Sequence, residues 1–346
     1  MPARRAFLLA IASGALPASA LGATQPALQR RRTVFGSPAA LLLARRADAA
    51  AGAAADAVFV GLQRMNDRWN AWKPGELSSA NAALRAGRPA TVSPALAAMI
   101  RGAAALESAS QGLFNPAIGR AVGGWGFHDD RLLPGARPSA AAIRRWQAQR
   151  PSLAQLDLRG TELRSRNPRV QLDFGAYAKG VAADWALAQL SAAGVADALV
   201  DLGGNVAAMG QGAEAPWRVG IRDPFGDGLV ASLHLRGREA VVTSGSYERW
   251  RLLDGERCCH IIDPASAVPA AGFVSVTVVH ASAALADAAA TAIFVAGPKR
   301  WRQAAQQLGV AQVLVIDAEG AARVTPALAG RMQFADAHWR RAVTPA

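Results

Sequence analysis

Residues 171–184, with the sequence QLDFGAYAKGVAAD, decide how the centre of this chain folds. A short apolar strand is predicted to end at Leu172, and a turn then leads into a helix predicted over residues 176–193. This order brings the carboxylate of Asp173, the backbone of the turn and the ammonium group of Lys179 to one point, as in many phosphate-binding sites. An N-capping aspartate followed by an exposed lysine is the alternative interpretation of the same residues.

The composition is that of a globular protein with a basic surface. The chain has 346 residues, of which 51% are hydrophobic, so it can bury a sizeable core in one or two domains. Its formal net charge is +13, but the arginines are scattered and no predicted helix carries a basic stripe interleaved with aromatic residues. Binding to nucleic acid is therefore not expected. The two cysteines, Cys258 and Cys259, are adjacent, so we expect no disulfide and, without a second ligand pair, no zinc site.

The N-terminal residues have the pattern of an export signal. In residues 1–23, Arg4 and Arg5 stand directly before an apolar run, and small residues follow it. The run is short and is broken by glycine and proline, which disfavours a membrane-spanning helix. We therefore expect a cleaved, twin-arginine-like signal, a periplasmic location and a mature protein that does not span the membrane. The remaining residues, 24–346, are expected to form a single domain.

Hydrophobic periodicity predicts an α+β domain with mostly antiparallel strands. Helices are predicted at residues 45–69, 94–110, 139–149, 176–193, 284–296 and 298–308. Strands are predicted at residues 39–43, 196–202, 217–221, 230–235, 240–242, 247–252, 273–279 and 312–316, with a hairpin inside residues 153–172. Residues 29–32 are interpreted as a basic leader, residues 70–81 as a loop that contains Trp72, and the residues after 316 as ending in a polar tail.

Three further motifs carry side chains suited to phosphate chemistry. Residues 243–247, TSGSY, form a hydroxyl-rich turn, and residues 260–264, HIIDP, place a histidine before a turn. Asp287 and Thr291 are four residues apart in a predicted helix, so their oxygens share one face and are the kind of hard ligand that Mg²⁺ accepts. The glycine pair at residues 203–204 is no dinucleotide-binding fingerprint, because the third glycine and the following helix are missing, and a tight hairpin turn explains it equally well.

The order and spacing of these motifs resemble those of the ApbE family, the FAD:protein FMN transferases. The family's patterns GxFDPTxGxxxxxWGF, DxGAxAKGxxxD, HIxDPxTGxP and ADxxxT have counterparts here in the same order. The matching segments are residues 72–81, 112–127, 173–184, 203–204, 243–247, 260–269 and 286–291. Seven motifs in order, over residues 30–335, make the resemblance specific.

The resemblance implies an α+β fold with two lobes around a flavin cleft, and a set of site residues within it. Trp72 would stack near the isoalloxazine ring, and His260 would assist removal of a proton from the attacking hydroxyl, a role that Asp173 is also placed to share. The residues implied to contact FAD are Trp72, Leu113, Phe114, Asn115, Asp173, Lys179, Gly203, Gly204, Thr243, Ser244, His260 and Ile261. The groups implied to hold Mg²⁺ at the pyrophosphate are the backbone oxygen of Ala176 and the side chains of Asp287 and Thr291.

The reaction implied by the resemblance is Mg²⁺-dependent transfer of FMN from FAD to a threonine or serine hydroxyl, with release of AMP. The implied partner is an acceptor flavoprotein of a respiratory or electron-transfer complex. Two alternatives stay open: an FAD pyrophosphatase, in which water replaces the hydroxyl, and a non-catalytic flavin-binding protein. The retained Asp287 and Thr291 favour catalysis, because a carrier needs no metal for phosphoryl transfer.

The chain departs from the family's pattern in three of its motifs. Asn115 and Ala117 stand where the family has aspartate and threonine, and Ser266 and Ala267 stand where it has threonine and glycine. Residues 35–37, FGS, replace the Met-Gly-Thr of many members. None of these positions is an implied metal ligand, but Ala267 occupies a turn position that usually needs glycine.

Overall fold

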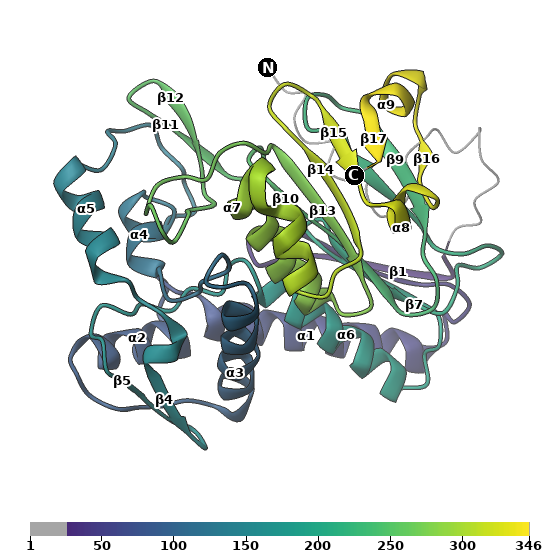
Figure 1. Cartoon of the computed structure of the whole chain (residues 1–346). Coiled ribbons are helices and arrows are strands. Elements are labelled where there is room, and N and C mark those ends of the chain that lie inside the picture. The colour runs from purple at the N-terminus through teal and green to yellow at the C-terminus, as the bar shows by residue number, and fades with distance from the viewer. Residues whose placement is uncertain (1–25, 346) are drawn as a thin grey trace.

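The computed structural model of the protein describes residues 26–345. Its centre is a nine-stranded sheet in the order β1-β2-β6-β7-β10-β13-β14-β15-β17 (Figure 1). Neighbouring strands of this sheet pair antiparallel except β15 and β17, so the predicted mostly antiparallel α+β fold is confirmed. The strands are β1 Leu28–Val34, β2 Ser37–Leu43, β6 Ala198–Leu202, β7 Asn205–Met209, β10 Glu239–Gly245, β13 Ser275–His280, β14 Gln312–Ile316, β15 Ala322–Val324 and β17 Val343–Pro345.

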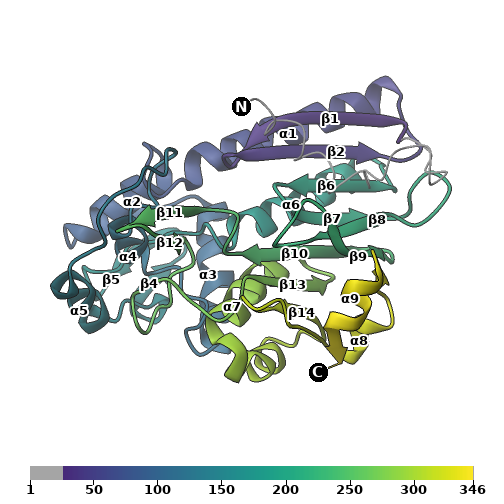
Figure 2. The ribbon, with the colours of Figure 1, turned by 90° about the horizontal axis from the view of Figure 1, so that it is seen from above.

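Three helices, α1 Ala49–Trp69, α6 Ala178–Ala192 and α7 Ala283–Gln307, cover one face of this sheet (Figure 2). Local side chains cap two of them: Asp48 Oδ1 accepts a hydrogen bond from Ala51 N at 2.8 Å at the start of α1, and Ser282 Oγ accepts from Leu285 N at 3.3 Å at the start of α7, whereas α6 has no side-chain cap. Helix α7 breaks at Gly297, which has a φ of 65° and precedes Pro298, as the two predicted helices require. Within residues 26–345, no helix is long and apolar enough to cross a membrane.

The opposite face of the sheet packs on a second hydrophobic cluster, to which the C-terminal residues contribute. The elements there are β8 Arg218–Arg222, β9 Leu229–His234, α8 Pro326–Ala329, β16 Gln333–Phe334 and α9 Ala337–Ala342. Leu328, Trp339 and Val343 are buried in this cluster. The predicted polar tail is therefore wrong: its few apolar side chains close the core, although no periodic pattern marks them.

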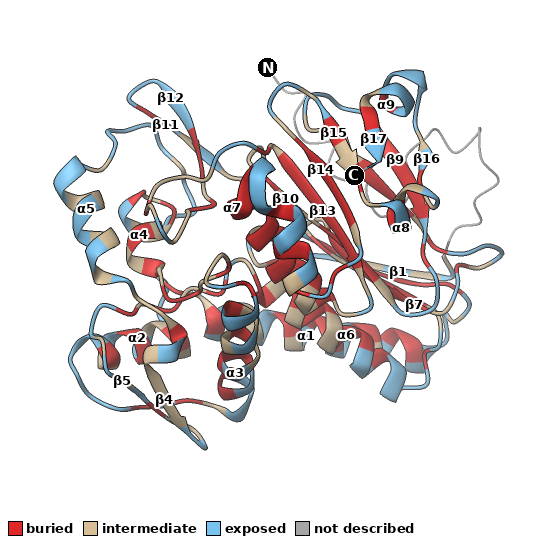
Figure 3. Cartoon of the chain, viewed as in Figure 1, coloured by how far each residue is buried: buried red, intermediate tan, exposed pale blue. Residues whose placement is uncertain are grey.

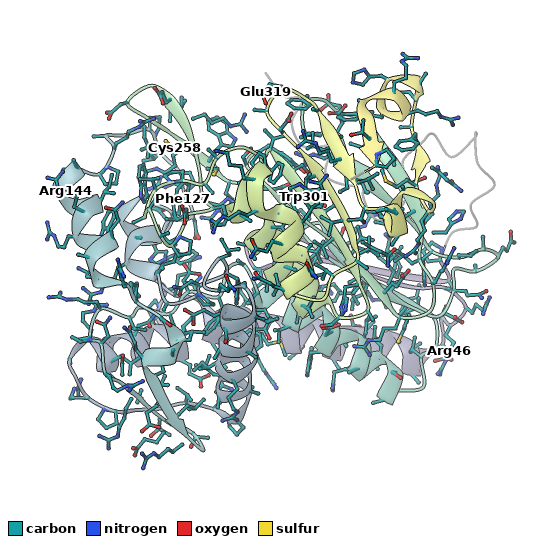
Figure 4. The ribbon with its side chains drawn as sticks, in the orientation of Figure 1. Arg46, Phe127, Arg144, Cys258, Trp301 and Glu319 are labelled. Atoms are coloured by element: carbon teal, nitrogen blue, oxygen red, sulfur yellow. The ribbon has the colours of Figure 1, made fainter. Side chains whose placement is uncertain are left out.

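A second region of helices and short strands lies beside the sheet (Figure 1). Its elements are α2 Glu76–Arg85, β3 Ala90–Thr91, α3 Pro94–Ala109, α4 Gly119–Gly124, α5 Ala140–Gln149, β4 Leu156–Arg159, β5 Glu162–Ser165, β11 Trp250–Leu253 and β12 Glu256–Cys259. Phe127 and Cys258, labelled in Figure 4, belong to a small cluster under the β11–β12 hairpin. Figure 3 shows that α5 is largely exposed, whereas the central strands are buried. Both cysteines are buried and form no disulfide.

Three local predictions are wrong for identifiable reasons. The basic leader is strand β1, whose arginines line an exposed sheet edge while its backbone pairs with β2. The predicted loop at residues 70–81 contains the start of α2, because Leu77 and Leu84 bury one face of a turn that Ser78 caps. The strand predicted to end at Leu172 is only an isolated bridge between Ile118 and Gln171. The predicted signal, residues 1–23, lies outside the described residues.

Candidate functional site

The loop that carries Asp173 is fixed by hydrogen bonds on both sides. Leu172 N donates to Asn81 Oδ1 at 2.7 Å, and Asn81 Nδ2 donates back to Leu172 O at 2.8 Å. Asp173 N donates to Pro116 O at 2.8 Å, and Asp173 Oδ1 accepts from Gly175 N at 2.8 Å. Because Asn81 is buried, this clamp holds the Asp173 carboxylate in one position without a regular strand.

Asp173 forms a buried pair with His128, a residue that the sequence did not single out. His128 Nε2 lies 2.8 Å from Asp173 Oδ2, and each side chain is 12% exposed. Burial opposes the charged carboxylate, yet the hydrogen bond and charge of His128 hold the pKa of Asp173 below its ordinary value. The His128 ring also stacks on Trp72, with centroids 5.1 Å apart and planes 17° from parallel. Trp72 and Asp173 are thus brought together through His128.

The start of α6 is joined directly to α7. Gly180 N donates to Asp287 Oδ2 at 2.9 Å, so this N–H does not bond the carbonyl of Ala176 as it would in a longer helix. The two helices approach closely here, because a Cβ on Gly180 would lie 2.4 Å from Ala283 O. Lys179, the neighbour of Gly180, is half-buried at the same helix start. The structure therefore brings the start of α6, with Lys179, against Asp287 of α7.

The electrostatics of Asp287 reflect this crowded position. Burial raises its pKa, and the positive charge of Lys179 opposes that rise. Asn205, also buried, lies close enough to lower the pKa of Asp287, yet its Nδ2 has no hydrogen-bond partner in the described part of the chain. A buried donor without an acceptor is costly, so this position suits an oxygen-rich ligand such as a phosphate.

Of the two adjacent hydroxyl residues in β10, only Ser244 faces α7. Ser244 Oγ lies 3.1 Å from Thr291 Oγ1, whereas Thr243 Oγ1 lies 2.8 Å from Thr277 Oγ1. Side chains alternate along a strand, and Val241 belongs to the cluster on the far face while Val242 belongs to the α7 face. The side chain of Thr243 therefore points away from Asp287 and Thr291.

The groups implied to hold Mg²⁺ supply the kind of oxygen atoms that this ion binds. The Ala176 carbonyl accepts no hydrogen bond from any donor within residues 26–345, and Asp287 Oδ1 has no hydrogen-bond partner there. Together with the Thr291 hydroxyl they offer three hard oxygens, which suits an ion that keeps water and substrate phosphate as its other ligands. Within the same residues, no group of three or more His, Cys, Asp or Glu side chains is arranged to hold a metal ion.

The folded protein favours the neutral form of the His260 side chain. Burial and the positive charges of Arg249 and Lys179 lower the pKa of His260 to about 4. Its Nδ1 lies 3.0 Å from Arg249 O, which can only accept, so Nδ1 carries the hydrogen and Nε2 keeps a lone pair. The ring meets Phe127 edge-on at 6.3 Å. The next residue, Ile261, is buried in the main core and anchors the segment.

The glycine pair makes the tight turn between β6 and β7. Gly204 N donates to Asp201 Oδ1 at 2.8 Å, and Gly203 N donates to Pro38 O at 3.0 Å. Gly203 has a φ of 64°, and a Cβ there would lie 2.5 Å from that of Ser37. Burial raises the pKa of Asp201 to about 6, with Lys179 acting against it. This turn therefore lies beside Lys179.

The segment implied to line the flavin is built around a buried phenylalanine. Phe114 is 2% exposed and lies 5.7 Å from the ring of Tyr177, while Leu113 is half-buried against the main core. Asn115 Nδ2 donates to Pro151 O at 2.9 Å, and Asn115 Oδ1 accepts from Ala117 N at 2.8 Å. An aspartate could not make the first of these bonds, which explains the asparagine in this chain.

Sequence reasoning missed three residues that complete the site: His128, Asp201 and Arg249. Arg249 donates to Phe127 O and Asp129 O at 3.1 Å and lies 5.9 Å from the Trp72 ring. His128 directly follows the WGF motif, which was the one available signal. Arg249 and Asp201 carry none, because only the tertiary fold places them: Asp201 lies on strand β6, and Arg249 is held by its bonds to the backbone of Phe127 and Asp129.

Fold and site together define a class of α+β protein, in which lysine and oxygen groups gather where two helices meet beside a large antiparallel sheet. The family model described as the ApbE family matches residues 35–315. The chain belongs to the ApbE family.

Two curated relatives show the extent of the similarity. The chain is 45% identical over 282 residues to the FAD:protein FMN transferase of Rhodobacter capsulatus, covering 82% of this chain and 54% of that protein. It therefore spans about half the length of that relative. It is 33% identical over 318 residues to the FAD:protein FMN transferase of Treponema pallidum, covering 85% of each.

Solved structures agree with the fold. The ApbE protein of Thermotoga maritima superposes with a TM-score of 0.80 at 26% identity, covering 88% of this chain and 99% of that one. The apo form of the flavinyl transferase ApbE of Pseudomonas stutzeri superposes with a TM-score of 0.72 at 26% identity, covering 85% and 92%. The family and the ApbE-like fold predicted from the sequence are thus confirmed.

Proposed function

We propose that the protein is an FAD:protein FMN transferase, which moves FMN from FAD to a threonine or serine hydroxyl of a partner protein and releases AMP. The observation that carries the proposal is the 2.9 Å bond between Gly180 N and Asp287 Oδ2, which joins the start of α6, next to Lys179, to Asp287 of α7. Two relatives of the chain carry the name of this activity.

The proposed reaction is a phosphoryl transfer at the pyrophosphate of FAD. The acceptor hydroxyl attacks the FMN phosphorus, the bond from that phosphorus to the bridging oxygen breaks, and AMP leaves with the bonding electrons. The hydroxyl proton passes to Nε2 of His260, which the folded protein keeps neutral. Lys179 and the Asn205 amide offer a positive charge and a hydrogen bond to the phosphate oxygens. Because little covalent work is left to the protein, positioning supplies most of the rate.

The proposal includes Mg²⁺ held by the Ala176 carbonyl, Asp287 and Thr291. When bound, the ion would neutralise charge on the pyrophosphate. The proposal also places FAD contacts on Trp72, on the segment of Leu113, Phe114 and Asn115, and on Asp173. The free carbonyl and the unpaired Asp287 oxygen described above support the metal ligands.

The proposed setting is the periplasm, with an acceptor flavoprotein of a respiratory or electron-transfer complex as partner. The arginine pair and apolar run in residues 1–23 support export. Cleavage of this segment and the single domain over residues 24–346 stay predictions. Mass spectrometry of the protein purified from a periplasmic extract would test the cleavage directly.

The test of the reaction type uses residues 24–346, FAD, Mg²⁺ and a candidate acceptor domain. Flavin fluorescence that stays with the acceptor on a denaturing gel would support the transferase. Release of free FMN and AMP without labelling would indicate the FAD pyrophosphatase, and intact bound FAD would indicate a non-catalytic carrier. The His260→Gln variant is expected to transfer FMN about 10²–10⁴-fold more slowly, because it removes the base while keeping a polar side chain.

A further inference from the structure

Arginines gather on one side of the helical region, away from the residues of the site. A hollow of about 500 Å³ opens between the end of α2 and the β4–β5 hairpin. Its lining includes Arg88, Arg159, Arg164 and Arg166 but only one carboxylate, that of Asp157. The hollow is therefore open to an anionic ligand.

Nearby carboxylates neutralise only part of this charge. Arg159 pairs with Asp157 at 3.2 Å, and Arg164 pairs with Glu162 at 2.7 Å. Within the described part of the chain, neither Arg88 nor Arg166 has a carboxylate oxygen within 4.0 Å. Their charges remain available.

A second group of arginines adjoins the hollow through the same segments of chain. Arg85 lies on α2 just before Arg88, and Arg169 lies on the loop that carries Arg166. Burial lowers the pKa of Arg120, and the charges of Arg169 and Arg85 lower it further, so the three guanidinium groups repel one another. Arg120 Nε is buried and has no hydrogen-bond partner among residues 26–345. An anion bound here would relieve both costs.

We call the surface formed by Arg85, Arg88, Arg120, Arg164, Arg166 and Arg169 the arginine face. The kinds of side chain on this face favour a protein as its ligand. Among residues 26–345, the exposed large hydrophobic residues are Val60, Leu133, Phe225, Trp250 and Leu252, and none lies on this face. The face therefore offers neither apolar side chains to insert into a bilayer nor aromatic rings to stack on bases. A concave surface rich in guanidinium groups suits the carboxylates of an extended acidic segment.

The arginine face is connected to the candidate site. Gly119 N donates to Gln171 O at 2.8 Å, and the next residue, Arg120, donates from Nη2 to Pro168 O at 3.0 Å. Gln171 is two residues before Asp173. A partner bound on the face would therefore lie beside the segment that leads to Asp173.

We propose that the arginine face binds an acidic segment of the protein that accepts FMN. The identity of this partner as the acceptor rests on the proposed function; the binding itself does not. The face would then supply affinity and orientation for the acceptor, separately from the groups that hold FAD.

The test measures binding of a fluorescein-labelled oligoglutamate peptide by anisotropy at two salt concentrations. The first variant, Arg85→Gln/Arg88→Gln/Arg169→Gln, changes exposed side chains that have no hydrogen-bond or ion-pair partner within residues 26–345. The control, Arg236→Gln/Arg340→Gln/Arg341→Gln, removes the same charge from the turn after β9 and from α9. We expect the first variant to weaken binding about 10-fold and the control to change it by less than about 2-fold.

Each other outcome would overturn the proposal. Equal weakening in both variants would mean that net charge alone binds the peptide, and no weakening in either would place the peptide elsewhere. Preferential binding of phosphatidylglycerol vesicles through the face would indicate a membrane instead. Covalent attachment of FMN to a candidate acceptor domain is measured in parallel: if it is absent in the wild type, the proposed function fails while the peptide result still decides the role of the face.

Discussion

Ala267 has a left-handed backbone, with a φ of 56°, at the position where the family pattern has glycine. An L-residue in this conformation is strained by about 1–2 kcal/mol. Replacing it with glycine relieves the strain, but part of this gain is offset because the methyl contacts are lost and the unfolded chain gains conformational freedom. We therefore expect Ala267→Gly to raise the free energy of unfolding by about 0.5–1 kcal/mol. Urea unfolding measures this, and a clear loss of stability would contradict it. The Ala267 carbonyl, which accepts from Trp125 Nε1 at 2.8 Å, is unchanged by the substitution.

Asp201 carries a buried carboxylate whose pKa is raised to about 6. Its folded pKa lies above the unfolded value near 3.9, so its contribution to stability is complete at low pH and is lost as the pH rises through about 6. Asp201→Asn keeps the acceptor for Gly204 N and removes the charge. The free energy of unfolding of the variant should exceed that of the wild type by about 1–3 kcal/mol at pH 7.5 and should equal it at pH 4. Chemical denaturation at both pH values measures the difference, and an equal gain at both would refute the assignment.

The site residues found from the sequence and those that were missed differ in how they reach the site. Asp173 and Asp287 belong to motifs that lie within one helix or turn, so the spacing along the sequence predicts which side chains are close together. His128 reaches Asp173 across 45 residues, and Arg249 reaches Trp72 through the β11 region, so only the tertiary fold unites them. The orientation of Thr243 was likewise unpredictable, because strand register decides which of two adjacent hydroxyls faces α7.

At the scale of elements, Asp184 of α6 caps the N-terminus of α7. Its carboxylate accepts from Ala283 N at 3.1 Å, from Ala284 N at 3.0 Å and from Ser282 Oγ at 2.8 Å. This cap fixes the two helices whose ends carry the candidate site. Asp184→Ala should lower the free energy of unfolding by about 2–3 kcal/mol, because it leaves three donors without an acceptor.

The measurement is thermal or urea unfolding, with Asp157→Ala as a matched control, since in the described part of the chain that carboxylate pairs only with an exposed arginine. The control is expected to change stability by less than about 0.5 kcal/mol. An Asp184→Ala protein as stable as the control would show that α7 does not depend on this cap.

Elements with strong periodicity were predictable, and those defined by a few contacts were not. Helix α3 begins at Pro94 after the Ser93 cap, as predicted from that pair. Helix α2 was missed because its first turn is closed by Ser78 and Gly75, a capping arrangement that a polar, turn-rich sequence conceals. Strand β1 was missed because its arginines carry no hydrophobic alternation.

For the whole molecule, His260 should make stability depend on pH in the acid range. Its folded pKa of about 4 lies below the unfolded value near 6.5, so the unfolded chain binds the extra proton between these values. Stability is then lost as the pH falls from about 6.5 to 4, opposite in sign to the effect of Asp201. Between pH 6.5 and 4.5, the free energy of unfolding of His260→Gln should fall by about 1–2 kcal/mol less than that of the wild type. Urea unfolding at these two pH values decides this, and identical losses would contradict it.

The proposed centre of FMN transfer is the junction of α6 and α7 at Asp287. The most direct test follows, in one time course, the AMP released and the mass of the acceptor after incubation with FAD and Mg²⁺. We predict one acceptor-bound FMN for each AMP released, and loss of both in Asp287→Asn, which keeps the acceptor for Gly180 N but removes the charge. AMP release without acceptor-bound FMN, or unchanged transfer by Asp287→Asn, would contradict the account.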